Sequence, residues 1–181
     1  MRVIKFALAI VPALVTVLAL TAGVVGANQS SGRVNLNDVR AATARYNSLT
    51  VAKAHKYAIL KDTQGIACIA NPGVGAMGVH YVNGDLVGTT GVNPLKPEAL
   101  VYEPQKNGQL RLVAVEYVTF KTQWDATHKA PPKLFGQTFM LTPDGNRFGL
   151  PAFYSLHAWI WKHNPSGTFA MWNPNVHCPA A

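Results

Sequence analysis

Three side chains suited to metal binding or acid–base chemistry fall within predicted strands: His80, Glu116 and His157. Two imidazoles and one carboxylate form a facial ligand set that suits Zn²⁺, Fe²⁺ or Cu²⁺ and leaves coordination positions open. The same groups could act without a metal, with Glu116 as a general acid or base beside an imidazole. Because the three residues are far apart in the sequence, only the fold can bring them together. The alternative for each histidine is a hydrogen-bonded core residue.

Glu116 is set among apolar residues of its own strand. Side chains alternate across a strand, so a strand over residues 110–119 places Leu110, Leu112, Ala114 and Val118 on the face of Glu116. A carboxylate on an apolar face is costly to bury unless it is paired, hydrogen-bonded or bound to a metal. A strand-end glutamate that accepts from loop N–H groups, or a bulge that turns it outward, is the alternative interpretation.

A second strand combines imidazoles with indoles. If a strand over residues 154–162 stays regular, one face carries the alternate residues Ser155, His157, Trp159, Trp161 and His163. Indoles offer flat platforms for sugars, bases or cations. The candidate ligand-binding residues are therefore aromatic: Tyr81, Tyr102, Trp159 and Trp161. In the alternative interpretation the tryptophans are a hydrophobic layer that packs on the N-terminal helices.

The elements that must position these residues are an N-terminal helical pair and a series of strands. Residues 35–57 have helical spacing, with Asn37 and Thr50 as candidate N-caps. Turn clusters then separate predicted strands at residues 66–70, 77–82, 98–103, 110–119, 135–141 and 154–162, while residues 121–133 are typical of a surface loop. We expect an α+β fold, in which the helical pair precedes a mainly antiparallel sheet or a partly closed barrel.

Composition limits the class of protein. The 181 residues are 49% apolar and only 13% charged, which excludes a disordered chain or a long coiled coil and suits one domain. The formal net charge is +8, but no run of three basic residues and no interleaved aromatic motif accompanies it. Nucleic acid is therefore not an expected partner.

The first 27 residues have the layout of a secretory signal peptide. Arg2 and Lys5 precede an uncharged stretch over residues 6–27, which closes on small residues at Val25, Gly26 and Ala27. Cleavage there leaves one globular domain, residues 28–181, in a secreted or periplasmic location with no stable membrane span. A retained anchor is the alternative, because an uncharged stretch of this length could cross a bilayer.

Two cysteines, Cys68 and Cys178, remain after that cleavage. In an exported protein the default is one disulfide, which here would hold the C-terminal residues against the start of the domain. We expect the two Cα atoms to lie about 4.4–6.8 Å apart. A cysteine metal site is the weaker alternative, because no CxxC spacing is present.

Several motifs resemble those of a family of small exported bacterial proteins. They are GAMGVHY at residues 75–81, KPEALVYEP at 96–104, LRLVAVEY at 110–117, LHAWIW at 156–161, NPSGTF at 164–169 and WNP at 172–174. The resemblance covers about residues 41–178, with Ala76 in place of a second glycine. It implies export and a single domain, and it implies no activity.

Together these features predict an exported protein with a small polar pocket that binds a divalent transition metal or a small ligand. One alternative is a hydrolase or lyase in which Glu116 and a histidine act as acid and base. The other is a structural envelope protein without a ligand. The sequence contains neither HExxH nor GxSxG, and a disulfide would remove a Cys–His nucleophile. The residues leave these interpretations open.

Overall fold

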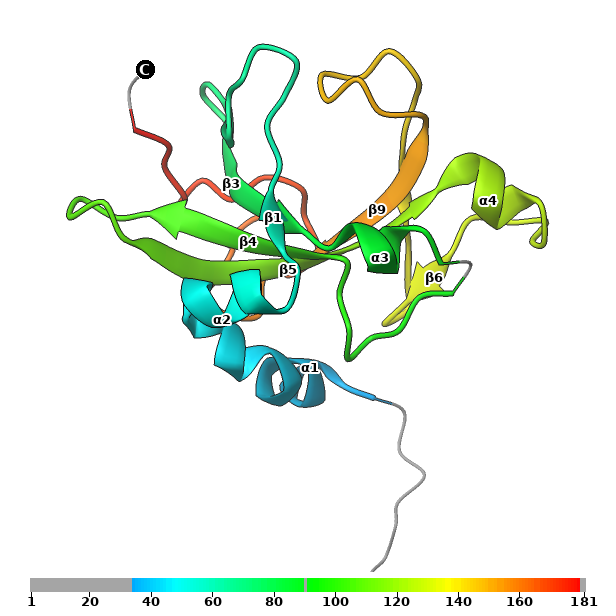
Figure 1. Cartoon of the computed structure of the whole chain (residues 1–181), viewed down its shortest axis with the longest axis horizontal. Helices are drawn as coiled ribbons and strands as arrows, with labels where there is room; N and C mark the ends of the chain where they lie inside the picture. The colour runs from blue at the N-terminus through cyan, green and yellow to red at the C-terminus, as the bar shows by residue number, and fades with distance from the viewer. Residues whose placement is uncertain (1–33, 90, 180–181) are drawn as a thin grey trace, which may run out of the picture. The chain divides into compact units, whose positions relative to one another are not determined.

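The computed structural model describes residues 34–89 and 91–179 (Figure 1), so the predicted signal peptide, residues 1–27, lies outside the described residues. The described chain begins with three short helical elements: α1 (Leu36–Thr43), the 3₁₀ turn η1 (Ala44–Asn47) and α2 (Leu49–Ala54). Within the described ranges, no helix is long and apolar enough to cross a membrane.

Both helices begin two residues away from where we predicted a cap. Asn35, not Asn37, caps α1, because its side chain accepts from the backbone of Asp38 while the Asp38 side chain accepts from that of Asn35. Ser48 rather than Thr50 caps α2 by accepting from the Val51 N–H. The reciprocal pair at Asn35 explains the first difference, since two N–H groups are satisfied at once.

The strands confirm the α+β fold class. Seven antiparallel strands form one sheet, and two short strands form another. The main sheet contains β1 (Ala58–Ile59), β2 (Cys68–Asn71), β3 (Gly75–Val82), β4 (Ala99–Pro104), β5 (Leu110–Phe120), β8 (Met140–Thr142) and β9 (Phe153–Ala158). Its order is β1-β3-β4-β5-β9-β8, with β2 also paired to β3. Because β1 and β8 end the path, the sheet is open, and the partly closed barrel is not observed.

The remaining elements correct two sequence predictions. The segment expected to be one strand at residues 135–141 is divided between β7 (Gln137–Thr138), which pairs with β6 (Lys133–Leu134), and β8 of the main sheet. The expected loop after β5 begins with the short helix α4 (Lys121–Asp125). A further one-turn helix, α3 (Gly84–Val87), follows β3 and is capped by Asn83.

A β-bulge in β5 reverses one prediction about its faces. Leu112 is opposite Tyr102, but the next pair is Ala114 with Val101, so Val113 is an extra residue. Leu112 therefore packs in the same core as Val115, whereas Val113 belongs to a second apolar cluster. The expectation that Leu110 and Leu112 share the face of Glu116 was wrong, because the bulge shifts the alternation by one residue.

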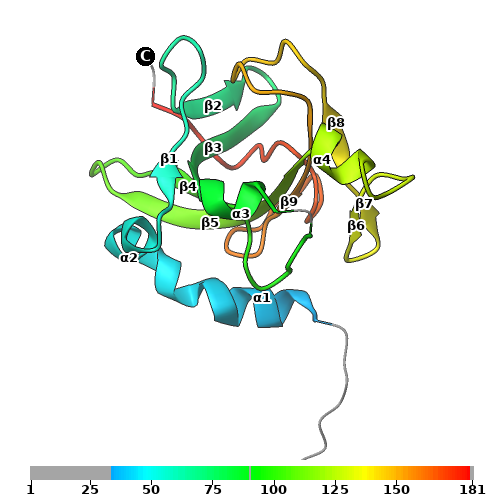
Figure 2. The same ribbon diagram turned by 45° about the vertical axis from the view of Figure 1, so that its right-hand side comes forward.

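The two faces of the sheet have different roles. Helices α1 and α2 lie against one face, and the loops after β1 and β8 rise on the other (Figures 1 and 2). The helix-covered face is a tyrosine-rich core, in which the Tyr102 hydroxyl donates to the Tyr46 carbonyl and the Tyr57 hydroxyl to the Pro97 carbonyl, each at 2.7 Å. The polar candidate residues lie on the opposite face.

The C-terminal segment crosses that opposite face and is held by two attachments. Asn173 exchanges backbone hydrogen bonds with Ala76, each 3.1 Å long, at the start of β3. At Gly75 the backbone comes so close to Asn173 that an added Cβ would lie 2.5 Å from its carbonyl oxygen. The predicted disulfide between Cys68 and Cys178 is confirmed, with Cα atoms 5.6 Å apart.

Glu98, just before β4, is a buried acid that the sequence did not indicate. It is 2% exposed, and an oxygen of its carboxyl group accepts from the Val118 N–H at 3.1 Å. Burial raises its pKa from 4.5 to about 8, and this hydrogen bond offsets only part of the shift. The residue is therefore held mostly protonated in the folded protein at neutral pH, while the unfolded chain has it ionised.

Removing the disulfide should destabilise the domain. We expect the double variant Cys68→Ala, Cys178→Ala to lower the free energy of unfolding by about 2–5 kcal/mol, because a long loop is no longer closed in the unfolded chain. Urea denaturation followed by tryptophan fluorescence measures this difference. Wild-type protein treated with a reductant serves as the control and should lose the same amount. Equal midpoints for oxidised and reduced wild type would contradict the expectation.

Glu98 should make stability depend on pH. Its folded pKa lies above its unfolded pKa, so its contribution is complete below about pH 4.5 and is lost as pH rises through about 8. We expect the wild-type free energy of unfolding to fall across this range, relative to Glu98→Gln, by at most about 1.4 kcal/mol per pH unit. Denaturation at several pH values measures the difference. Parallel curves for the two proteins would show that Glu98 does not titrate as described.

Candidate metal centre

His80, Glu116 and His157 meet on the open face of the sheet, from strands β3, β5 and β9. Glu116 and His157 are direct cross-strand neighbours, since β5 and β9 pair at these two residues. His80 is opposite Val101 of β4, which leaves one whole strand between it and β5. Adjacent strands are about 4.8 Å apart, so the imidazole must lean across β4 to reach Glu116.

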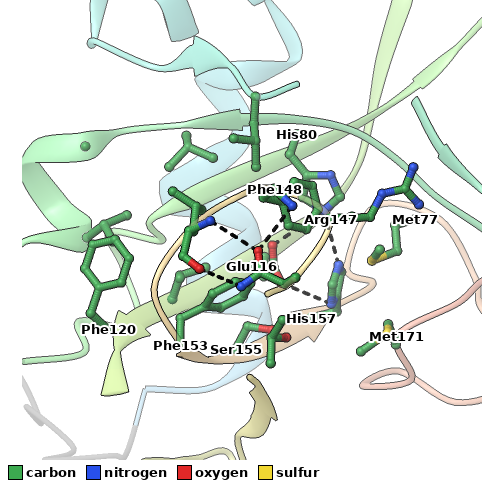
Figure 3. Close-up of a pocket in the computed structure, with 18 of the residues that line it drawn as sticks. Met77, His80, Glu116, Phe120, Arg147, Phe148, Phe153, Ser155, His157 and Met171 are labelled. Atoms are coloured by element: carbon green, nitrogen blue, oxygen red, sulfur yellow. Dashed lines mark hydrogen bonds and ion pairs between the residues drawn. The ribbon is translucent and has the colours of Figure 1, made fainter. Parts of the chain in front are cut away.

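Strand β4 permits this approach because it presents small side chains where His80 crosses. Ala99 is the residue paired with Glu116, and its methyl group occupies little of the space between the two outer strands. Val101, paired with His80, is fully buried. The side chains of all three candidate residues thus point toward one another (Figure 3).

Three short distances join the members of the triad. His80 Nε2 lies 3.4 Å from His157 Nε2 and 3.5 Å from Glu116 Oε2, while His157 Nδ1 lies 3.5 Å from Glu116 Oε1. One ligand atom from each residue can be chosen so that all lie within 4.8 Å of one another. Ligand atoms about 2.0–2.1 Å from a tetrahedral Zn²⁺ are separated by roughly 3.3 Å. Because His157 uses Nε2 toward His80 and Nδ1 toward Glu116, the short distances do not share one atom per residue, and the ligand atoms that can be chosen together lie within 4.8 Å of one another.

The same distances are long for direct hydrogen bonds. Strong N–H···O bonds span about 2.7–3.2 Å, so contacts of 3.4 and 3.5 Å satisfy these buried groups poorly. His80 Nδ1 has no hydrogen-bond partner among the described residues. The exposed fractions are only 3% for His80, 8% for Glu116 and 3% for His157. The triad therefore gathers three buried side chains that could bind a metal, while its own contacts satisfy them poorly.

Burial sets the protonation of the site. It lowers the pKa of His80 to about 4; Glu116 opposes this shift and His157 adds to it. Burial alone lowers the pKa of His157 to about 4. The pKa of Glu116 is raised by burial, against opposing effects of His80 and a hydrogen bond with Ser155. Both imidazoles are therefore neutral at pH 7, which is the state that ligates metals.

The triad lines a cavity of about 540 Å³ whose walls are mainly apolar. Figure 3 shows aromatic and sulfur-containing side chains around it. The apolar lining residues are Leu60, Met77, Val82, Val87, Val118, Phe120, Phe148, Leu150, Phe153, Met171 and Trp172. A cavity of this size is in the range that holds small organic ligands.

The cavity is bordered by two loops that are fastened to each other. Arg147 donates to the buried carboxylate of Asp62 at 2.6 Å, and its carbonyl accepts from the Thr63 N–H at 3.0 Å. Within the second loop, the Asn146 side chain accepts from the N–H groups of Phe148 and Leu150. The wall is therefore preformed by hydrogen bonds.

The four aromatic candidates are not among the cavity-lining residues. Tyr81 and Tyr102 contact each other edge to face in the core, on the helix-covered side. Trp159 stacks beside His157, with ring centroids 6.1 Å apart, and its indole donates to the Ala170 carbonyl. Trp161 donates to Thr43 of α1. The structure brings none of them to the cavity, although Trp159 supports a triad residue.

The predicted ladder of alternating residues was wrong because β9 ends at Ala158. The N–H groups of Trp161 and Lys162 both donate to the Val113 carbonyl at the bulge, each at 3.1 Å. This attachment turns Trp161 toward the helices, where the Arg40 guanidinium lies 4.8 Å above its ring. Trp161 therefore packs on the N-terminal helices, as the alternative interpretation of this strand predicted.

Sequence reasoning missed most of the cavity wall. Phe148 and Leu150 come from a segment in which only a turn was recognised, and Trp172 stands between two turn signals. No local pattern indicates that these residues share one cavity with β3 and β5. Their only signal is that they are large apolar residues in segments rich in glycine, proline and asparagine.

Comparisons with protein-family models, with curated proteins and with solved structures found no match to this chain. Membership of the family of small exported bacterial proteins stays a prediction from the motifs. The function is therefore argued from the site.

Proposed function

We propose that this is an extracytoplasmic protein that binds one divalent transition metal through His80, Glu116 and His157. The observation that carries the proposal is the buried triad, whose ligand atoms lie within 4.8 Å of one another. The contacts of 3.4 and 3.5 Å within the triad are long for hydrogen bonds, so an ion among the three residues would supply a partner that these buried groups lack.

The ligand types favour Zn²⁺, Fe²⁺ or Cu²⁺. Imidazole nitrogen suits these ions, whereas Ca²⁺ and Mg²⁺ require oxygen ligands. Three protein ligands leave at least one coordination position, and the triad lines a cavity from which that position can be filled. A closed structural site would instead have four protein ligands.

Two observations support a location outside the cytoplasm. The disulfide joins Cys68 to Cys178, and such bonds persist in oxidising compartments. The first 27 residues also have the layout of a secretory signal peptide. The resemblance of the motifs to small exported bacterial proteins agrees with both.

Metal binding is tested on the mature protein without an affinity tag. After loading with Zn²⁺ and desalting, we expect close to one ion per chain by mass spectrometry. Glu116→Gln and His157→Ala should each weaken binding by more than about tenfold, the smallest loss associated with changes to a metal's outer-shell partners.

The matched control is His163→Ala, which removes an exposed imidazole and should bind as wild type does. Repeating the loading with Fe²⁺ and Cu²⁺ ranks the metals. Stoichiometry near zero for every ion would refute the proposal. Equal binding by the wild type and both triad variants would place the metal elsewhere and refute it as well.

A second candidate function is metal-free hydrolysis or elimination by the same groups. The observation that favours it is the raised pKa of buried Glu116 beside two neutral imidazoles in an apolar cavity. A carboxyl in such surroundings can exchange a proton with a bound substrate.

Turnover that persists after a chelator has removed all metal would distinguish this candidate from a metal-binding function. If it holds, chelator-treated protein hydrolyses small aryl esters or glycosides, and Glu116→Gln lowers kcat by about 10²–10⁴-fold because the proton donor or acceptor is lost. His163→Ala again provides the control. If no turnover depends on Glu116, the enzyme hypothesis is rejected. If the protein also binds no metal, the remaining interpretation is a structural envelope protein.

A further inference from the structure

The charges around the triad do not balance once a divalent ion is bound. Both histidines are neutral and Glu116 carries one negative charge when ionised, so the ion and its three ligands have a net charge of +1. Among the described residues that line the cavity, Glu116 is the only acid. Arg147 is the one cation among those described lining residues, and it is already paired with Asp62 at 2.6 Å. A buried charge of this kind is costly unless an anion pairs with it.

The open coordination position therefore favours an anionic donor. A hydroxide ion would balance the charge of the site, but water would then have to fill the rest of the cavity. That space is about 540 Å³, and Phe120, Phe148, Phe153 and Leu150 contribute apolar walls to it. Water is held poorly by such walls, whereas an alkyl or aryl group gains free energy there.

We propose that the cavity binds an apolar organic carboxylate, whose carboxylate group completes the metal's coordination and whose hydrocarbon body lies among the aromatic and aliphatic walls. This inference rests on the proposed function. The positive charge of the site favours the carboxylate group of the ligand, and the apolar walls favour its hydrocarbon body. An alkylammonium ion of the same length meets the second requirement and fails the first.

The wall is built to receive such a body without rearrangement. The Asn146 side chain donates to the Leu150 carbonyl at 2.7 Å and accepts from its N–H at 3.3 Å, which holds this residue in place at the cavity. Arg147 keeps the same loop attached to Asp62. A preformed apolar wall adds affinity because little conformational entropy is lost on binding.

The test is calorimetric titration of Zn²⁺-loaded mature protein with sodium butanoate, hexanoate and octanoate. We expect binding to tighten about fourfold for each added methylene, the increment for burying one CH₂ group. Octylammonium chloride should bind at least tenfold more weakly than octanoate. The metal-free protein should bind octanoate much more weakly, because the triad then lacks the positive charge of the ion.

A matched pair of variants locates the body of the ligand. Leu150→Trp fills the cavity and should weaken octanoate more than tenfold while changing butanoate less. Leu141→Trp makes the same change at an exposed position, with the residue 49% accessible and outside the cavity lining, and should behave as wild type. Retention of one Zn²⁺ per chain shows that each variant is folded.

The outcomes separate this inference from the proposed function. If Zn²⁺ binds but affinity does not rise with chain length, or octylammonium binds as tightly as octanoate, the inference is overturned and the metal site stands. Equal octanoate affinity with and without metal also overturns it. If no metal binds, the proposed function fails first, and the inference fails with it.

Discussion

The β-bulge at Val113 decides which side chains of β5 face the helices and which face the cavity. Leu112 belongs to the tyrosine-rich core, and regular alternation would place Glu116 in that core beside it. One extra residue moves the carboxylate to the open face. The carbonyl of Val113 accepts hydrogen bonds from the N–H groups of Trp161 and Lys162. The bulge residue therefore also fixes where the chain turns after β9. The position of Glu116 and the end of β9 are therefore coupled.

The open face carries buried polar groups whose contacts with one another are long. His80, Glu116 and His157 are nearly inaccessible, yet their mutual contacts of 3.4 to 3.5 Å are weak as hydrogen bonds. Burial lowers the pKa values of the imidazoles and raises that of the carboxyl, which means that their charged forms are disfavoured. An ion among them would restore the missing interactions, since it supplies the charge that the carboxylate needs and a partner for the imidazole lone pairs.

The cavity above these groups is assembled from segments that are distant in the chain. Met171 and Trp172 reach it because the C-terminal segment is held to β3 by the bridge at Ala76 and to β2 by the disulfide at Cys68. The opposite wall depends on the attachment of Arg147 to the loop after β1. These attachments are a backbone bridge, a disulfide and an ion pair with a buried carboxylate, and they fix the wall before any ligand is bound.

The sequence by itself predicted the fold class, the pairing of the cysteines and the three candidate residues of the triad, but not that these three residues meet. Periodicity, turn residues and residue chemistry are local properties, and they were sufficient for these features. The tertiary structure alone decided which residues share a face after the bulge, because Val113 has no side-chain property that marks an inserted residue. It also decided that Trp161 packs on α1 and that Trp172 and Leu150 line the cavity. Those outcomes depend on backbone hydrogen bonds between distant segments, such as that from Trp161 to Val113. Every residue except proline has the same backbone N–H and C=O groups, so the residue types do not indicate which of these groups will pair.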